Sequence, residues 1–172
     1  MDECICKFLD RLCSEYNRLN NTNLQSSQID SWYLDKFIGE QGKEIFRKQG
    51  FFDKLEPFPN AIKIVKKLNN EHDIIIASKP QNKETSLDKY NWLEEYMPFI
   101  RFNQVVLGEY KHLIKADIMI DDCEYYLDLF KENCNGTTIC IDREYNKKFK
   151  ADYRIYDTNW LEIYDIIKKI QS

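Results

Sequence analysis

The chain has 172 residues and a formal net charge of -4, and 43% of its residues are hydrophobic, which suits one domain with a sizeable core. The acidic balance argues against a nucleic-acid polymer as partner, because that needs a basic face, but it leaves room for a single nucleotide. No stretch has the length of a membrane-spanning helix, no signal peptide is visible, and the six scattered cysteines fit a reducing compartment, so we expect a cytoplasmic protein that does not bind a membrane.

The first part of the chain is predicted to be helical. Apolar residues between Ile5 and Leu19 recur every three or four positions, and the polar run Asn20 to Asn23 ends that pattern. The next stretch, up to about Pro57, is aromatic and polar, contains three glycines and shows no strand alternation. We therefore expect it to form short helices in a small accessory lobe.

Beyond Pro59, predicted helices alternate with predicted strands. Asn60 is expected to cap an amphipathic helix that begins at Ala61, and Asn159 is expected to cap the last helix. Short continuous apolar runs predict strands at 74–77, 104–107, 117–120 and 137–141, and helical spacing predicts helices at 84–96 and 125–130. This alternation is typical of an α/β fold, in which helices cover both faces of a parallel sheet.

Polar side chains follow three of these strands. Ser78 comes directly after the first strand, Lys111 follows the second by a short turn, and Asp121 and Asp122 close the third. Because the carboxyl ends of parallel strands lie at one edge of a sheet, these residues should converge there. Adjacent carboxylates can bind Mg²⁺, a lysine can neutralise phosphate oxygens, and a serine hydroxyl can donate to a phosphate. Together they can stabilise a phosphoryl group in transfer.

Each of these features also has an ordinary structural explanation. An acidic pair after a strand is often a solvated turn, a lysine in a lysine-rich chain is often on the surface, and a serine at a strand end is often a cap. A receiver domain also combines an acidic pair, a hydroxyl and a lysine, but there the acidic pair comes first and the lysine last. Here the acidic pair comes last, which counts against a receiver domain.

The order of the motifs resembles that of the haloacid dehalogenase superfamily, and more closely that of its 5′(3′)-deoxyribonucleotidases. The residues that carry the resemblance are Ile76-Ala77-Ser78, Lys111 and the run Asp117 to Asp122, together with Gly50-Phe51-Phe52, the run Asp88 to Leu93 and the run Asp142 to Asn146. The resemblance implies a three-layer, Rossmann-like parallel sheet with a truncated first strand. It also implies a small helical cap at residues 13–57, inserted into a core of residues 1–12 and 58–172.

The resemblance assigns roles to individual residues. Asp2 matches the second aspartate of the family's first motif, a general acid/base whose backbone carbonyl also binds Mg²⁺. Ser78 would hold the phosphoryl group, Lys111 would neutralise it, and Asp121 and Asp122 would bind Mg²⁺ as the cofactor. The expected substrate-binding residues are Phe8, Trp32, Tyr33, Phe52, Ser78 and Lys79. Core packing is the alternative for the four aromatic residues. The implied partner is a small phosphomonoester, in particular a nucleoside monophosphate, and a homodimer is left open.

Two departures from the family pattern matter. The nucleophilic aspartate of the first motif, which forms an aspartyl-phosphate, would stand directly before Met1 and is missing from the chain. In addition, Glu109 and Tyr110 precede Lys111, where family members often carry a basic residue. The sequence therefore predicts a Mg²⁺-dependent nucleotide phosphatase whose nucleophile lies upstream. Its alternatives are a non-catalytic relative that binds a nucleotide or a partner, and an inactive, poorly stable fragment with a misassigned start.

Overall fold

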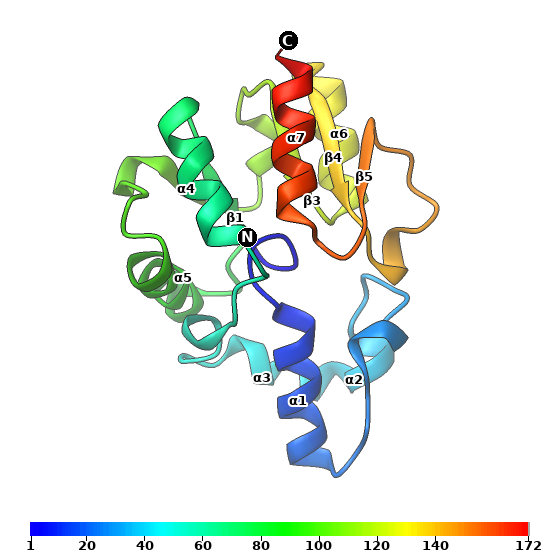
Figure 1. The fold of residues 1–172 in the computed structure, drawn as a ribbon. Helices are drawn as coiled ribbons and strands as arrows, with labels where there is room; N and C mark the ends of the chain where they lie inside the picture. Colours follow the sequence, from blue (N-terminus) through cyan, green and yellow to red (C-terminus); the bar gives the residue numbers. More distant parts are fainter. Residues whose placement is uncertain (172) are drawn as a thin grey trace.

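The computed structural model describes residues 1–171 and has the predicted α/β architecture (Figure 1). Within these residues the strands form two parallel half-sheets instead of one sheet. The strands are β1 (Ile76–Ser78), β2 (Val105–Leu107), β3 (Ile118–Asp121), β4 (Thr137–Ile141) and β5 (Tyr153–Ile155). The smaller half-sheet has the order β1-β2 and the larger one the order β3-β4-β5. Strands β1 and β3 are therefore the inner edges of the two half-sheets.

Helices surround both half-sheets (Figure 1). They are α1 (Phe8–Asn20), α2 (Asp35–Gly42), α3 (Glu44–Arg47), α4 (Ala61–Glu71), α5 (Lys83–Tyr96), α6 (Glu124–Cys134) and α7 (Trp160–Ile170). Helix α4 beside the smaller half-sheet packs against α7 beside the larger one, and the hydroxyl of Tyr164 donates to Glu71 at 3.1 Å there. Of the helices between residues 1 and 171, none is long and apolar enough to span a membrane.

Helices α1, α2 and α3 lie together at the bottom of the view in Figure 1. The predicted start of the cap, residue 13, falls inside α1, so the exact division into cap and core stays a prediction. The chain leaves this lobe through a turn at Gly50, where φ is 85°. The buried carboxylate of Asp88 on α5 accepts the backbone N–H groups of Gly50, Phe51 and Phe52 at 2.8, 3.1 and 3.3 Å. These bonds attach the lobe to the core.

The predicted helices and strands are all present, and their ends differ by a few residues. Strand β1 begins two residues later than predicted, and the side-chain amide of Gln104 donates to the carbonyl of Ile74 at 2.9 Å. Asn60 precedes α4 with a left-handed backbone, φ 62°, but without the expected cap bond from its side chain. Asn159 caps α7 through its side chain, as predicted. Strand β5 has no clear sequence signal, because it is three residues long and two of them are polar or amphipathic.

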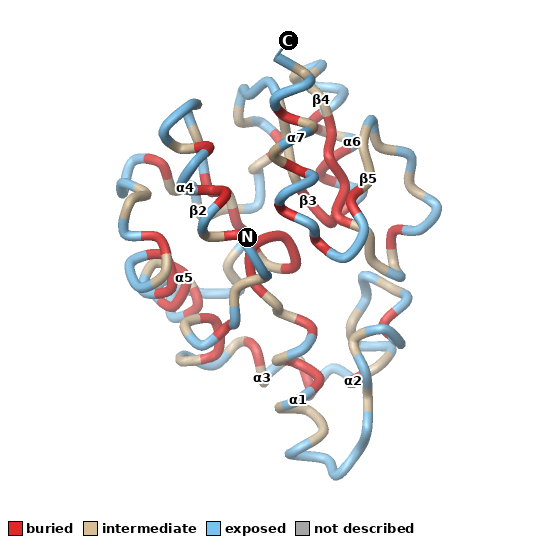
Figure 2. The backbone as a smooth tube through the Cα atoms, viewed as in Figure 1, coloured by how far each residue is buried: buried red, intermediate tan, exposed pale blue. Residues whose placement is uncertain are grey.

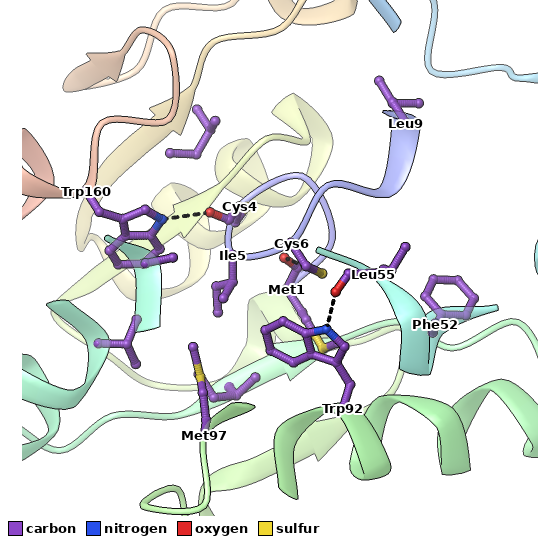
Figure 3. Close-up of a cluster of buried hydrophobic side chains, with 14 of the residues drawn as sticks. Met1, Cys4, Ile5, Cys6, Leu9, Phe52, Leu55, Trp92, Met97 and Trp160 are labelled. Carbon is purple, nitrogen blue, oxygen red and sulfur yellow. Dashed lines mark hydrogen bonds between the residues drawn. The ribbon is translucent and has the colours of Figure 1, made fainter. Parts of the chain in front are cut away.

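The first six residues form a tight loop between the half-sheets, where buried segments gather (Figures 1 and 2). The carbonyl of Met1 accepts backbone N–H groups from within the loop, the shortest bond being 2.8 Å. Two tryptophans fix the surroundings (Figure 3). The indole of Trp160 donates to the carbonyl of Cys4 at 2.9 Å, and that of Trp92 donates to the carbonyl of Leu55 at 2.7 Å. The loop is therefore part of the core.

Most of the cysteines lie in the interior of the protein. Five of the six are buried, Cys134 is half-buried, and all are free thiols. Burial raises the pKa of the Cys13 thiol to about 11, so this thiol is protonated at neutral pH. The cysteines therefore act as small apolar side chains.

Candidate active site

A cavity of about 370 Å³ lies at the carboxyl ends of β1 and β3. Ser78 is the last residue of β1, Lys111 begins the 3₁₀ turn after β2, and Asp121 is the last residue of β3. The predicted site residues that line the cavity are Asp2, Phe8, Trp32, Tyr33, Phe52, Ser78, Lys79, Lys111 and Asp122. Asp121 does not line the cavity itself, but its carboxylate is bonded to Lys111, which does. The structure thus brings together residues that are far apart in the sequence.

The acidic pair is buried. Asp121 is 3% exposed and Asp122 is 5% exposed. Asp121 accepts the ammonium of Lys111 on one oxygen and the backbone N–H of Cys123 on the other, the latter at 3.0 Å. Asp122 accepts the phenol of Tyr145 at 2.5 Å. Burial raises the pKa of Asp122 and the charge of Asp121 raises it further, while the bond from Tyr145 opposes both. With both carboxylates charged, two negative charges therefore face one bonded lysine, an environment that favours a further cation.

Lys111 carries the central positive charge of the site. Burial alone would lower its pKa, but the Asp121 carboxylate raises the pKa of Lys111 above its ordinary range, so the ammonium stays charged at neutral pH. The ammonium also lies over the ring of Tyr126, 4.3 Å from its centroid. Lys111 is therefore held in place from two sides.

Asp2 binds a lysine that the sequence reasoning missed. The ammonium of Lys89 donates to both carboxylate oxygens of Asp2, at 2.7 and 2.6 Å, and lies 3.9 Å from the ring centroid of Phe52. The side chain of Asp2 therefore faces Lys89 and does not join the acidic pair. The sequence did contain a signal for this contact, because Lys89 falls on the otherwise buried face of α5 and a buried lysine needs a partner. That face consists of Thr85, Asp88, Lys89, Trp92 and Leu93.

Replacing Lys89 by methionine should lower the free energy of unfolding by about 1.5–3 kcal/mol, since a charged hydrogen bond is lost. Methionine can fill the fully buried volume of Lys89, and the side chain of Asp2 is 27% exposed and can be hydrated in its place. Urea unfolding measures the loss. Lys83→Met, at an exposed position of the same helix, should change stability by no more than about 0.5 kcal/mol. Equal losses in both variants would show that the Asp2–Lys89 pair contributes nothing.

The four predicted aromatic residues fall into two groups. Phe8 and Phe52 stack with ring centroids 5.8 Å apart, and Phe52 is 1% exposed, so they are core residues that also form a wall of the cavity. Trp32 and Tyr33 are 51% and 67% exposed. The ring of Trp32 meets Tyr145 edge-on at 5.5 Å. Only this second group leaves flat faces available to stack on a ligand.

Further cations surround the cavity. Lys79 donates to Glu109 at 2.7 Å, so the acidic residue that departs from the family pattern neutralises part of the charge expected there. Lys43 and Arg47, at the two ends of α3, also line the cavity, although the sequence did not single them out. Their signal is weak because both lie in a charged stretch, where each forms an ion pair with a nearby glutamate. The cavity is therefore lined by both acidic side chains, such as Asp122, and basic side chains, such as Lys79 and Lys111.

The acidic pair fits Mg²⁺, which proteins commonly bind through one or two carboxylates while it keeps several waters. Asp121 and Asp122 supply two adjacent carboxylates. Within residues 1–171 no three His, Cys, Asp or Glu side chains converge as a metal site. The carboxylate of Asp2 is bonded to Lys89, so water would supply the remaining ligands unless the backbone of Asp2 contributes.

The fold resembles that of a known hydrolase class. A solved structure described as a "putative haloacid dehalogenase-like hydrolase" from Burkholderia xenovorans aligns with a TM-score of 0.57, covering 94% of this chain and 92% of that one. Sequence identity is 14%, so this similarity concerns the fold. The protein therefore has a haloacid dehalogenase-like, Rossmann-like fold.

Sequence comparisons define the family. A family model described as "5' nucleotidase, deoxy (Pyrimidine), cytosolic type C protein" matches residues 1–171. A "Putative 5'(3')-deoxyribonucleotidase" from Staphylococcus epidermidis is 33% identical over 176 residues, covering all of this chain and 95% of the relative. The 5'(3')-deoxyribonucleotidase of Bacillus subtilis is 29% identical, covering 95% of this chain and 92% of the relative. The chain belongs to the 5′(3′)-deoxyribonucleotidase family of haloacid dehalogenase-like proteins, as its motifs predicted.

Proposed function

We propose that this site belongs to a Mg²⁺-dependent phosphatase that hydrolyses (deoxy)nucleoside monophosphates through an aspartyl-phosphate intermediate. The observation that carries the proposal is the convergence of Ser78, Lys111 and the Asp121-Asp122 pair at one edge of the half-sheets. Family membership supports the type of reaction, and the names of the relatives support a nucleotide as substrate. The cavity of about 370 Å³ suits a small phosphomonoester.

Each residue has a defined task in this proposal. The hydroxyl of Ser78 and the ammonium of Lys111 bind phosphoryl oxygens, and Lys79 adds positive charge at the rim. The exposed faces of Trp32 and Tyr33 stack on the base. Binding therefore fixes both ends of the nucleotide, which positions the phosphorus atom for attack.

The proposed chemistry needs a nucleophile and a proton carrier. The nucleophile is an aspartate directly before Met1, since Asp2 matches the second aspartate of the motif. Asp2 protonates the leaving oxygen and later accepts a proton from the attacking water, and Lys89 orients its carboxylate. Asp121 and Asp122 would hold Mg²⁺, which would supply positive charge to stabilise the phosphoryl group.

A non-catalytic relative that binds a nucleotide is the second candidate. The observation in its favour is that, within residues 1–171, the acidic groups at the cavity already have partners. Asp2 is bonded to Lys89, Asp121 to Lys111, and Asp35 lies 3.5 Å from Lys43. None of these carboxylates stands ready to attack phosphorus.

One experiment separates the two candidates. The 172-residue chain is compared with a version extended at its N-terminus by a short apolar strand that ends in aspartate. Binding of a deoxynucleoside monophosphate and release of phosphate are measured with and without Mg²⁺. We expect both versions to bind and only the extended version, with Mg²⁺, to release phosphate. An extended chain that binds but releases no phosphate supports the second candidate and overturns the first.

Variants of the extended version test the roles of the residues. Asp2→Asn and Ser78→Ala should each lower kcat by about 10²–10³-fold, because they remove a proton carrier and a phosphate donor. Ser86→Ala, a matched change on α5 outside the cavity, should leave kcat unchanged.

A further inference from the structure

The loop that follows β4 is fixed to three strands through Asn146, whose side chain is buried. The side-chain amide of Asn146 donates to the backbone carbonyls of Asp122 and Ile141, at 2.7 and 2.8 Å. The side-chain oxygen of Asn146 accepts the guanidinium of Arg154 at 2.9 Å. Asp122 follows β3, Ile141 ends β4 and Arg154 lies in β5. The backbone at Asn146 is therefore held in place, and with it the preceding residue, Tyr145.

The hydroxyl of Tyr145 contacts the acidic pair. It donates to Oδ2 of Asp122 at 2.5 Å. In the part of the chain that the structure describes, the other carboxylate oxygen, Oδ1, accepts only the thiol of Cys4, at 3.6 Å, and a thiol is a weak donor. The bond from Tyr145 therefore fixes the orientation of the Asp122 carboxylate. Carboxylates that bind metal ions are commonly held by a hydrogen bond of this kind.

The ring of Tyr145 contacts the lobe that contains α1, α2 and α3. In Figure 1 the loop before α2 lies beneath the loop after β4, and there the indole of Trp32 meets the ring of Tyr145 edge-on. The ring centroids are 5.5 Å apart and the ring planes lie at 75°. Within residues 1–171 this is the one ring contact of Trp32, whose side chain is otherwise largely exposed. Tyr145 therefore supports the indole of Trp32 at the cavity.

Tyr145 joins two parts of the cavity that belong to different elements. Asp122, Tyr145 and Trp32 all line the cavity, although Asp122 follows β3 and Trp32 precedes α2. The hydroxyl of Tyr145 makes one of the two contacts and its ring makes the other. A side chain that only filled space would need no hydroxyl bonded to a buried carboxylate. One side chain on a fixed loop can therefore orient both an acidic group and a stacking surface.

We propose that Tyr145 is a positioning residue for both halves of the site: its hydroxyl orients Asp122 to bind Mg²⁺, and its ring orients Trp32 to stack on a nucleotide base. This role rests on the proposed function, which assigns Mg²⁺ to the acidic pair and the base to Trp32. The two contacts use different parts of one side chain, so they can be removed separately. Tyr145→Phe removes the hydroxyl and keeps the ring, whereas Tyr145→Leu removes both.

Binding of Mg²⁺ without nucleotide tests the hydroxyl. The melting temperature of each 172-residue protein is measured against MgCl₂ concentration, relative to its own value without Mg²⁺, which gives a Kd independent of activity. Tyr145→Phe and Tyr145→Leu should both weaken Mg²⁺ binding by about 10-fold or more, the usual effect of losing a hydrogen bond to a metal ligand. Tyr156→Phe removes an exposed hydroxyl outside the cavity and should leave the Kd unchanged.

Binding of thymidine monophosphate in the presence of EDTA tests the ring. Tyr145→Phe keeps the edge-on contact and should bind the nucleotide within about 2-fold of the original protein. Tyr145→Leu should bind it about 3–10-fold more weakly, because the aromatic pair that holds Trp32 is lost. In a Trp32→Leu background the change from Tyr145 to leucine should have no further effect, which shows that the ring acts through Trp32. Tyr145→Met replaces Tyr145→Leu if the leucine variant does not unfold cooperatively.

Two results would overturn the role of Tyr145. The first is a Kd for Mg²⁺ in Tyr145→Phe equal to that in Tyr156→Phe. The second is equal nucleotide binding by Tyr145→Phe and Tyr145→Leu, which would show that the ring does not act on Trp32.

Release of phosphate separates this role from the proposed reaction. If both affinities change as expected and the extended chain releases no phosphate, the phosphatase proposal fails and the role of Tyr145 in binding stands. If the extended chain releases phosphate and Tyr145→Phe binds Mg²⁺ as well as the original protein, the role of Tyr145 fails and the phosphatase proposal stands. A protein that binds no Mg²⁺ would overturn both.

Discussion

Replacing Lys111 by methionine should lower the free energy of unfolding by about 3–5 kcal/mol, the cost of leaving a buried charge without its partner. The side chains of Lys111 and Asp121 are 9% and 4% exposed, so water cannot take the place of the lost ammonium. The removal also leaves Asp121 beside Asp122, two adjacent buried carboxylates whose like negative charges repel each other and are no longer compensated. Urea unfolding of both proteins at pH 7 measures the difference. The same change should abolish measurable binding of inorganic phosphate at the cavity.

Two control variants separate this effect from a general loss of packing. Lys131→Met breaks an ion pair with Asp152 at the surface, where both side chains are more than a third exposed, and should cost no more than about 1 kcal/mol. Adding Asp121→Asn to Lys111→Met removes the stranded charge, so the double variant should recover much of the lost stability. If Lys111→Met costs no more than Lys131→Met, the buried pair has no role in stability.

The convergence of Ser78, Lys111 and the acidic pair could be predicted from the sequence, because it depends on the order of strands and polar residues along the chain. Short apolar runs predicted β1 and β3, and the polar residues at their ends, Ser78 and Asp121, then had to share one edge. The chain order of serine, lysine and acidic pair separated this arrangement from a receiver domain and led to the correct family. Such inferences need only the period of a strand and the direction of its neighbours.

Contacts between distant segments could not be read in this way. Lys89 is 87 positions from Asp2, and nothing local indicates that the two side chains meet. The same holds for Arg143, which is 140 positions from Glu3. A buried charge on a helix face, as at Lys89, indicates that a partner exists but does not identify it. The division into two half-sheets also depends on long-range pairing.

Replacing Arg143 by methionine is the second change for which we expect a loss of about 3–5 kcal/mol. The guanidinium of Arg143 donates to the carboxylate of Glu3 at 2.6 Å, to the backbone carbonyl of Glu3 at 2.6 Å and to the hydroxyl of Thr158 at 2.8 Å. Glu3 also accepts the backbone N–H of Leu9 at the start of α1. The pair therefore fixes the loop of the first six residues, and its loss leaves a buried carboxylate uncompensated. Arg18→Met, which breaks an exposed helical pair, is the matched control and should cost no more than about 0.5 kcal/mol.

The pH dependence of this defect gives a sharper test. Burial raises the pKa of Glu3, while Arg143 and the N–H of Leu9 oppose that rise. Without Arg143 the pKa of Glu3 should rise further. A carboxyl whose pKa is raised on folding favours the folded state below its unfolded pKa, and this contribution is lost as the pH increases through the folded pKa. The defect of Arg143→Met should therefore be largest near pH 7 and shrink as the pH falls toward about 4. In the double variant with Glu3→Gln this dependence should disappear, and a defect that stays constant with pH in Arg143→Met would show that the charge of Glu3 is not its cause.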